Sequence, residues 1–109
     1  MKSKHQQYLE GLAIIMKLAA EPKKHRKQLA RFITERHDYQ VSPFSCVALT
    51  MEVGGRNFYS EGYSRQNPVD IWNPVEGLGR AYEKALLEVC EQVEQAVIEH
   101  WFDLPLDGS

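Results

Sequence analysis

The sequence predicts an α+β fold with two N-terminal helices, one antiparallel β-hairpin and a long C-terminal helix. Two observations lead to this prediction. The spacing of apolar residues changes along the chain from the helical period of about 3.6 residues to the strand period of about 2, and back again. The chain has 109 residues, of which 43% are hydrophobic, which suits one core and is too little for two. We therefore expect residues 1–109 to form a single domain.

Residues 3–20 are predicted to form the first helix, with Ser3 suited to cap its N-terminal end. Its apolar residues share one stripe at helical spacing: Tyr8, Leu12, Ile15 and Ala19. Pro22 disfavours helical geometry at the residue before it and suits the first position of a new helix. The chain is therefore expected to bend at this point.

A second helix is predicted at residues 22–37. Its apolar seam is thin, because it contains only Leu29, Phe32 and Ile33. Basic side chains occupy the other faces, so this helix is expected to lie on the surface. The basic patch consists of Lys23, Lys24, Arg26, Lys27 and Arg31.

Residues 44–63 are predicted to form an antiparallel β-hairpin. Apolar side chains alternate along its first half, and Gly54-Gly55 can supply the two positive φ angles of a tight turn. An isolated two-stranded hairpin is only marginally stable, so it must pack against the C-terminal helix or extend its sheet by self-association. The expected contacts join Val47, Leu49 and Met51 to Leu86, Val89 and Val93.

The C-terminal part is predicted to contain a loop, a helix and a tail. Residues 64–76 hold two Asn-Pro steps and no regular apolar period, so a loop is expected. Residues 77–101 carry apolar side chains at three- and four-residue steps and predict a long helix with an acidic outer face. Residues 102–109 are expected to form a fraying tail.

The loop is the candidate partner-binding site, because it combines large apolar side chains with prolines that limit the freedom of the unbound loop. The candidate residues are Asn67, Pro68, Val69, Asp70, Ile71 and Trp72. In the alternative interpretation, Ile71 and Trp72 fold back and cover the core. Exchange of an X-Pro bond between cis and trans takes ~10–100 s without a catalyst. Pro68 is therefore a candidate docking point for a prolyl isomerase, with Pro74 as the second candidate.

Charge is distributed unevenly along the chain. Residues 1–40 hold nine basic and four acidic groups (net +5), and residues 41–109 hold four basic and eleven acidic groups (net −7). The basic patch is interpreted as a solvated face, with an acidic protein or duplex nucleic acid as alternative partners. Double-stranded-RNA-binding modules place three strands before the last helix and a basic cluster at its start. Here only two strands are predicted before the last helix, and that helix is acidic. Duplex nucleic acid is therefore a less favoured partner than a protein.

Several classes of protein are not indicated. The longest apolar run, Leu12–Met16, is far below the ~20 residues of a membrane helix, and the N-terminus lacks the apolar region and cleavage site of a signal peptide. Cys46 and Cys90 have no CxxC spacing and are expected to be buried thiols in a reducing cytoplasm. No catalytic motif surrounds any histidine, so we expect neither enzymatic activity nor a metal or cofactor.

The chain combines four features in order along the sequence: a basic helical N-terminus, a hairpin, the loop from Asn67 to Trp72 and a long acidic helix. In this pattern it resembles, over roughly its full length, the anti-RecBCD (Abc) accessory proteins of lambdoid temperate phages. The resemblance implies a non-enzymatic protein in the cytoplasm of the bacterial host. Such a protein would bind the RecBCD helicase-nuclease, through its RecC subunit, and alter its handling of DNA ends and Chi sites. A host cyclophilin-type prolyl isomerase is implied as a second partner, with Pro68 as the matching position. The alternative function is a small duplex-nucleic-acid-binding module that uses the basic helix 22–37.

Overall fold

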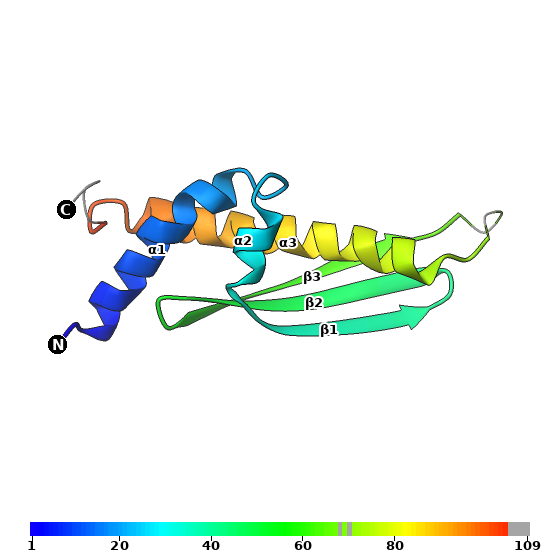
Figure 1. Ribbon diagram of the computed structural model, residues 1–109, viewed down its shortest axis with the longest axis horizontal. Coiled ribbons are helices and arrows are strands. Elements are labelled where there is room, and N and C mark those ends of the chain that lie inside the picture. Colours follow the sequence, from blue (N-terminus) through cyan, green and yellow to red (C-terminus); the bar gives the residue numbers. More distant parts are fainter. Residues whose placement is uncertain (68, 70, 105–109) are drawn as a thin grey trace.

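The computed structural model describes residues 1–67, 69 and 71–104, which form two layers (Figure 1). One layer is a three-stranded antiparallel sheet in the order β1-β2-β3, and the helices cover one of its faces. The molecule is elongated, with principal extents of 55 × 22 × 22 Å. The predicted α+β class is confirmed. The elements are α1 (Lys4–Ala20), α2 (Arg26–Ala30), β1 (Ile33–Val41), β2 (Phe44–Val53), β3 (Arg56–Arg65) and α3 (Pro74–Glu99).

The third strand, β1, corrects two predictions, a helix over residues 22–37 and a two-stranded hairpin. Within that stretch only Arg26–Ala30 are α-helical, and residues 33–41 pair with β2. Leu29 is the buried side chain of α2, so a longer helix here would bury too little apolar surface to stabilise itself. Pairing with β2 instead gives the backbone its hydrogen-bond partners. The segment is also rich in the β-branched and aromatic types that strands favour: Ile33, Thr34, Tyr39 and Val41.

α1 begins directly after Ser3, which forms a capping box with Gln6. The Ser3 hydroxyl accepts a hydrogen bond from the Gln6 backbone N–H, and the Gln6 side chain accepts one from the Ser3 backbone N–H, each at 3.1 Å. The side chains that this helix buries include the predicted stripe: Tyr8, Leu12, Ile15 and Ala19.

The boundaries near the C-terminus also differ from the predicted ones. β3 continues to Arg65 and α3 begins at Pro74, so the connecting loop is residues 66–73 rather than 64–76. Asn73 explains the early start, because its Oδ1 atom accepts a hydrogen bond from the backbone N–H of Glu76 at 3.1 Å. α3 ends at Glu99 rather than at residue 101. The predicted tail lies outside the described residues beyond residue 104.

The core lies between the sheet and α3. The side chains expected to meet belong to one buried cluster: Val47, Leu49, Met51, Leu86, Val89 and Val93. β3 lies very close to α3, since a Cβ atom on Gly62 would be 2.0 Å from the carbonyl oxygen of Ala81. Gly54 and Gly55 form the turn between β2 and β3, with φ angles of 58° and 85°, as the hairpin prediction requires.

The two outer edges of the sheet differ. Two side chains of α3 reach the backbone of β3: Lys84 Nζ donates to the carbonyl oxygen of Tyr63 at 2.9 Å, and Gln92 Nε2 donates to that of Tyr59 at 2.6 Å. In the described part of the chain, no strand pairs with the outer side of β1. Within the described residues neither outer edge pairs with a further strand, and the β3 edge differs in that α3 side chains bind two of its carbonyl oxygens.

Candidate binding surface

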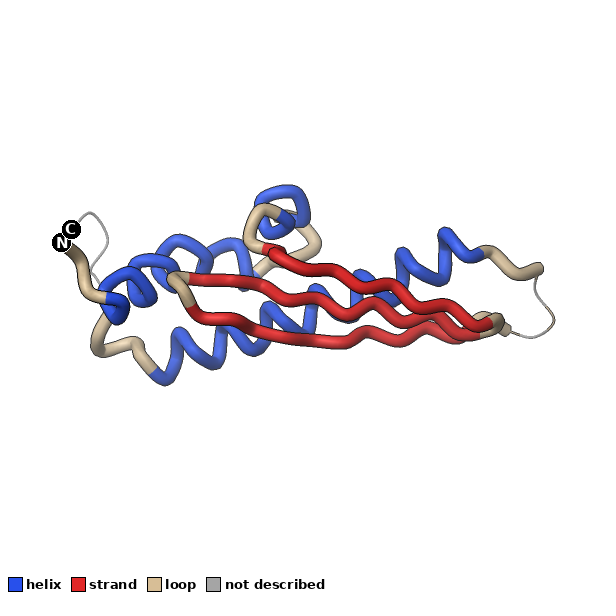
Figure 2. Tube along the Cα trace, turned by 90° about the horizontal axis from the view of Figure 1, so that it is seen from below, coloured by secondary structure: helices blue, strands red, loops and turns tan. Residues whose placement is uncertain are grey.

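No part of the chain that the structure describes covers the sheet face opposite the helices, and Figure 2 looks onto this face. Side chains alternate along each strand, and alternate residues of β2 from Ser45 to Val53 are buried toward the helices. The register of the three strands assigns the other residues to the uncovered side, which we term the open face. The open face consists of Glu35, His37, Tyr39 and Val41 of β1, Phe44, Cys46, Ala48, Thr50 and Glu52 of β2, and Asn57, Tyr59, Glu61, Tyr63 and Arg65 of β3.

Five large apolar side chains of the open face are exposed, and we term them the aromatic patch. Their exposed fractions are 62% for Tyr39, 77% for Val41, 53% for Phe44, 53% for Tyr59 and 60% for Tyr63. Contiguous exposed apolar area marks sites of interaction, and aromatic residues carry much of the binding energy at protein interfaces. The aromatic patch is therefore the candidate functional surface.

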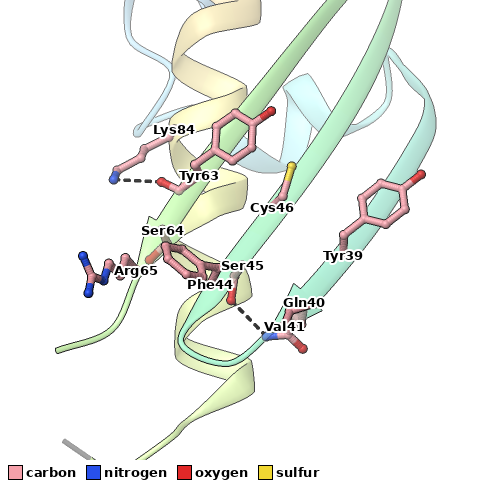
Figure 3. A pocket seen from close by; sticks show the side chains of 10 residues that line it. All are labelled: Tyr39, Gln40, Val41, Phe44, Ser45, Cys46, Tyr63, Ser64, Arg65 and Lys84. Carbon is pink, nitrogen blue, oxygen red and sulfur yellow. Dashed lines mark hydrogen bonds between the residues drawn. The ribbon is translucent and has the colours of Figure 1, made fainter. Parts of the chain in front are cut away.

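A hollow of about 640 Å³ lies at the end of the sheet where β1 turns into β2. Its lining includes four members of the aromatic patch, all except Tyr59. Figure 3 shows the Tyr39 and Tyr63 rings on either side of the Cys46 thiol. The hollow can accept an apolar side chain of a partner between these rings.

Glu61 lies between Tyr59 and Tyr63 on β3, and its carboxylate accepts a hydrogen bond from each hydroxyl. These hydrogen bonds raise the pKa of Tyr59 and that of Tyr63 to about 12 each, and they lower the pKa of Glu61. Both rings are held in position before a partner arrives. Less side-chain freedom is then lost on binding.

The charges of the open face are mainly negative. Glu35, Glu52 and Glu61 carry three carboxylates. The guanidinium of Arg65 is the one Lys or Arg group on this face and lies 5.5 Å from the centroid of the Phe44 ring. A surface of this kind attracts a basic partner and repels phosphate.

Cys46 is half-buried at the centre of the aromatic patch. Burial raises the pKa of its thiol, which favours the neutral form of this small apolar side chain. Among the residues that the structure describes, no group of three or more His, Cys, Asp or Glu side chains is placed to hold a metal ion.

The predicted partner-binding loop lies at the same end of the sheet as the hollow (Figure 1). Its first residue, Gln66, donates its backbone N–H to the carbonyl oxygen of Pro43 in the β1–β2 turn at 2.9 Å. Val69 and Ile71 are 86% and 93% exposed, so Ile71 does not cover the core as the alternative interpretation expected. Trp72 is half-buried and Asn67 is exposed. Pro68 and Asp70 lie outside the described residues.

The basic patch lies on α2 and on the residues that flank it, and all five of its members are exposed. Two of its groups face Glu83 of α3, with Lys23 Nζ at 3.6 Å and Arg26 Nη2 at 3.1 Å from Oε1. Lys24 Nζ lies 3.7 Å from Oε2 of Glu21. Three of the five basic groups are therefore paired with carboxylates of the chain itself.

The sequence prediction did not include the aromatic patch. The helix predicted at residues 22–37 took in the first half of β1, and no element was predicted for residues 38–43, so Tyr39 and Val41 were assigned to no sheet. In a strand with one buried face, the large apolar residues usually point to the core. On β3 the opposite holds, because small residues face α3 and the tyrosines face outward. The signal that could have indicated this is the run of small residues at every second position: Ser60, Gly62 and Ser64.

No protein-family model, no curated protein and no solved structure matches the chain. Within the described residues, no helix is both long and apolar enough to cross a membrane. Function is therefore inferred from the geometry and charge of the surface.

Proposed function

We propose that the chain is a non-enzymatic binding protein that docks another protein on its open face. The observation that carries the proposal is the aromatic patch, which places five exposed apolar side chains on one uncovered sheet face. Burying such side chains in an interface removes apolar surface from water, which favours association. The tyrosines held by Glu61 add directed polar groups to this apolar surface.

The charges of the open face favour a protein over a nucleic acid as the partner. Aromatic surfaces that stack bases are accompanied by a basic groove that follows the phosphates. The open face instead carries three carboxylates and one arginine, which would repel a phosphate backbone. The partner that fits is an apolar protein segment flanked by lysine or arginine.

The resemblance to the Abc proteins supports RecBCD as this partner, with RecC as the contacting subunit. In this proposal the chain changes how RecBCD handles DNA ends and Chi sites without catalysing a reaction itself.

The test compares two double variants of the full chain as baits for a bacterial lysate and for purified RecBCD. Phe44→Ser with Tyr63→Ser removes two rings of the aromatic patch. Ile14→Ser with Ile98→Ser removes two side chains of similar exposure, 66% and 62%, from the helices and serves as the control. Loss of two central aromatic side chains is expected to weaken binding by about a hundredfold or more.

A bound protein that the parent chain and the control retain, and that the patch variant loses, supports docking on the open face. If the patch variant binds the same proteins as the parent chain, the open face is not the docking surface. If no patch-dependent signal is seen with purified RecBCD, the proposed partner is wrong.

Duplex nucleic acid is the second candidate partner, because the structure has three strands before the last helix, the order found in double-stranded-RNA-binding modules. The charge at the start of α3 does not follow that pattern. Arg80 pairs with Glu76 four residues earlier on the same helix, and Glu83 pairs with Lys23 and Arg26 of the basic patch. Lys27→Gln with Arg31→Gln should weaken duplex binding if this candidate is correct and leave protein docking unchanged.

A further inference from the structure

The unpaired edge of β1 carries charges of both signs. From Thr34 to Tyr39 every residue of the strand is exposed. Arg36 and Asp38 lie on the helix side of the sheet, since they are opposite the buried residues Leu49 and Val47. Arg36 donates to Asp38 twice, from Nε at 2.8 Å and from Nη2 at 3.2 Å. The Arg36 guanidinium also lies over the Tyr82 ring, 4.7 Å from its centroid, which fixes its position at the edge.

These charges complement a second copy of the same strand. When two β1 strands pair antiparallel about His37, Arg36 of each copy lies opposite Asp38 of the other. Opposite charges at directly facing positions stabilise an antiparallel pair.

Neighbouring registers lack this complementarity. Directly opposite residues of an antiparallel pair point to the same face, so the sheet stays continuous only when the register moves by two residues at a time. One such shift places Arg36 opposite Arg36, and the other places Asp38 opposite Asp38. Like charges at facing positions destabilise the pair. The register centred on His37 is thus selected by charge.

We propose that the chain forms a symmetric homodimer through antiparallel pairing of β1 with β1 of a second copy. The two sheets then join into one six-stranded sheet, with both sets of helices on one side and both aromatic patches on the other. Charges of a single sign on an edge strand would make two copies of the chain repel each other. The opposite charges of Arg36 and Asp38 instead favour pairing with a second copy in one register.

The test measures the molar mass of the full chain in solution by sedimentation equilibrium over a range of concentrations. The parent chain is expected to be a dimer. Arg36→Asp places two carboxylates opposite each other across the interface, and Asp38→Arg places two guanidinium groups there. Each single variant is expected to dimerise about tenfold or more weakly than the parent.

Mixing the two variants provides the decisive control. In the mixed dimer each new acidic side chain faces a basic one, so the equimolar mixture is expected to regain the parent's dimer constant. Far-UV circular dichroism checks that both variants fold. A monomeric parent chain, or a mixture of folded variants that associates no better than either alone, overturns the proposal. The Phe44→Ser, Tyr63→Ser variant is expected to remain dimeric, which separates this result from docking on the open face.

Discussion

At the scale of single residues, Glu61 controls the ionisation of the two tyrosines beside it. Tyr59 and Tyr63 keep their protons in the folded chain up to a pKa of about 12, above the ordinary tyrosine value of 10.0. The folded state therefore binds more protons than the unfolded state between these two pH values, and the free energy of unfolding falls as the pH rises through them. Glu61, whose pKa is lowered from 4.5, contributes stability above that value and loses it on acidification.

Replacing Glu61→Gln is expected to lower the pKa of both tyrosines, because the amide keeps an acceptor oxygen but loses the negative charge that opposes their ionisation. The measurement is an alkaline titration followed by the ultraviolet absorbance of tyrosinate. Glu52→Gln, which removes another carboxylate of the open face, is the control. Titration curves for the parent and Glu61→Gln that coincide would contradict the assigned hydrogen bonds.

Gly62 allows the close approach of α3 to β3, so Gly62→Ala is expected to destabilise the fold. The added Cβ atom would lie 2.0 Å from the Ala81 carbonyl oxygen and 2.5 Å from the Ala85 nitrogen, and both are backbone atoms that cannot move independently. The expected loss in the free energy of unfolding is about 1–3 kcal/mol or more. Urea unfolding followed by circular dichroism measures it.

Gly79→Ala is the matched control on α3, because nothing lies within 4 Å of its added Cβ atom. Alanine is a better helix former than glycine, so this variant is expected to gain up to about 1 kcal/mol. If Gly62→Ala is as stable as the parent, the tight crossing of β3 and α3 described above is wrong.

At the scale of elements, the sequence correctly predicts the helices and strands whose apolar spacing agrees with the capping or turn residues at their ends. α1 has a single stripe and a capping serine, and the β2–β3 hairpin has alternation and two glycines at its turn. β1 has no such pattern, because only Ile33 and Gln40 of its nine residues are even partly buried. An edge strand that is exposed on both sides is specified by its pairing with β2. That pairing is non-local and cannot be read from a window of sequence.

The same limit applies to the aromatic patch. Tyr59 and Tyr63 are separated from Tyr39 by β2, and only the register of three strands brings them to one face. Their exposure depends on α3, which covers the other face because Gly62 and its neighbouring serines leave room for it. The loop that contains Asn67 and Trp72 was predictable as a loop, since its prolines and apolar residues are adjacent in sequence, and its role in binding stays a prediction.

Pro68→Ala tests the predicted role of this loop in binding a prolyl isomerase. The variant is expected to lose binding to a host cyclophilin while retaining the parent's circular dichroism spectrum. Surface plasmon resonance with purified cyclophilin measures the interaction, and Pro74→Ala is the comparison. Equal binding by the parent and Pro68→Ala would rule out Pro68 as the docking point.

At the scale of the whole molecule, the two oppositely charged parts of the chain fold against each other. Lys23, just before α2, and Arg26, within α2, both form ion pairs with the carboxylate of Glu83 on α3. These pairs are largely exposed, and exposed pairs contribute only about 0–1 kcal/mol each. Their main effect is to reduce the basic charge that is free to meet an outside partner.

The salt dependence of the binding constant distinguishes the two candidate partners, duplex nucleic acid and a protein. Duplex binding through the basic patch would fall steeply with salt as counterions are released, by several orders of magnitude between about 50 and 200 mM if many phosphates were contacted. Docking on the aromatic patch is expected to change by less than about tenfold over the same range, since apolar burial is not screened. Binding constants measured at both salt concentrations test this. A steep loss would favour duplex nucleic acid.

The hydrogen bonds from Lys84 and Gln92 to the carbonyl oxygens of β3 have a consequence for assembly. A sheet that offers strands on both sides can add copies without end and grow into a fibre. Here Lys84 and Gln92 of the helix that builds the core occupy two of the carbonyl oxygens on the outer edge of β3 that a further strand would need. In the proposed dimer, pairing through β1 uses the other edge, and the contacts at β3 oppose the addition of further copies. The same contacts that pack helix against strand are therefore expected to limit polymerisation.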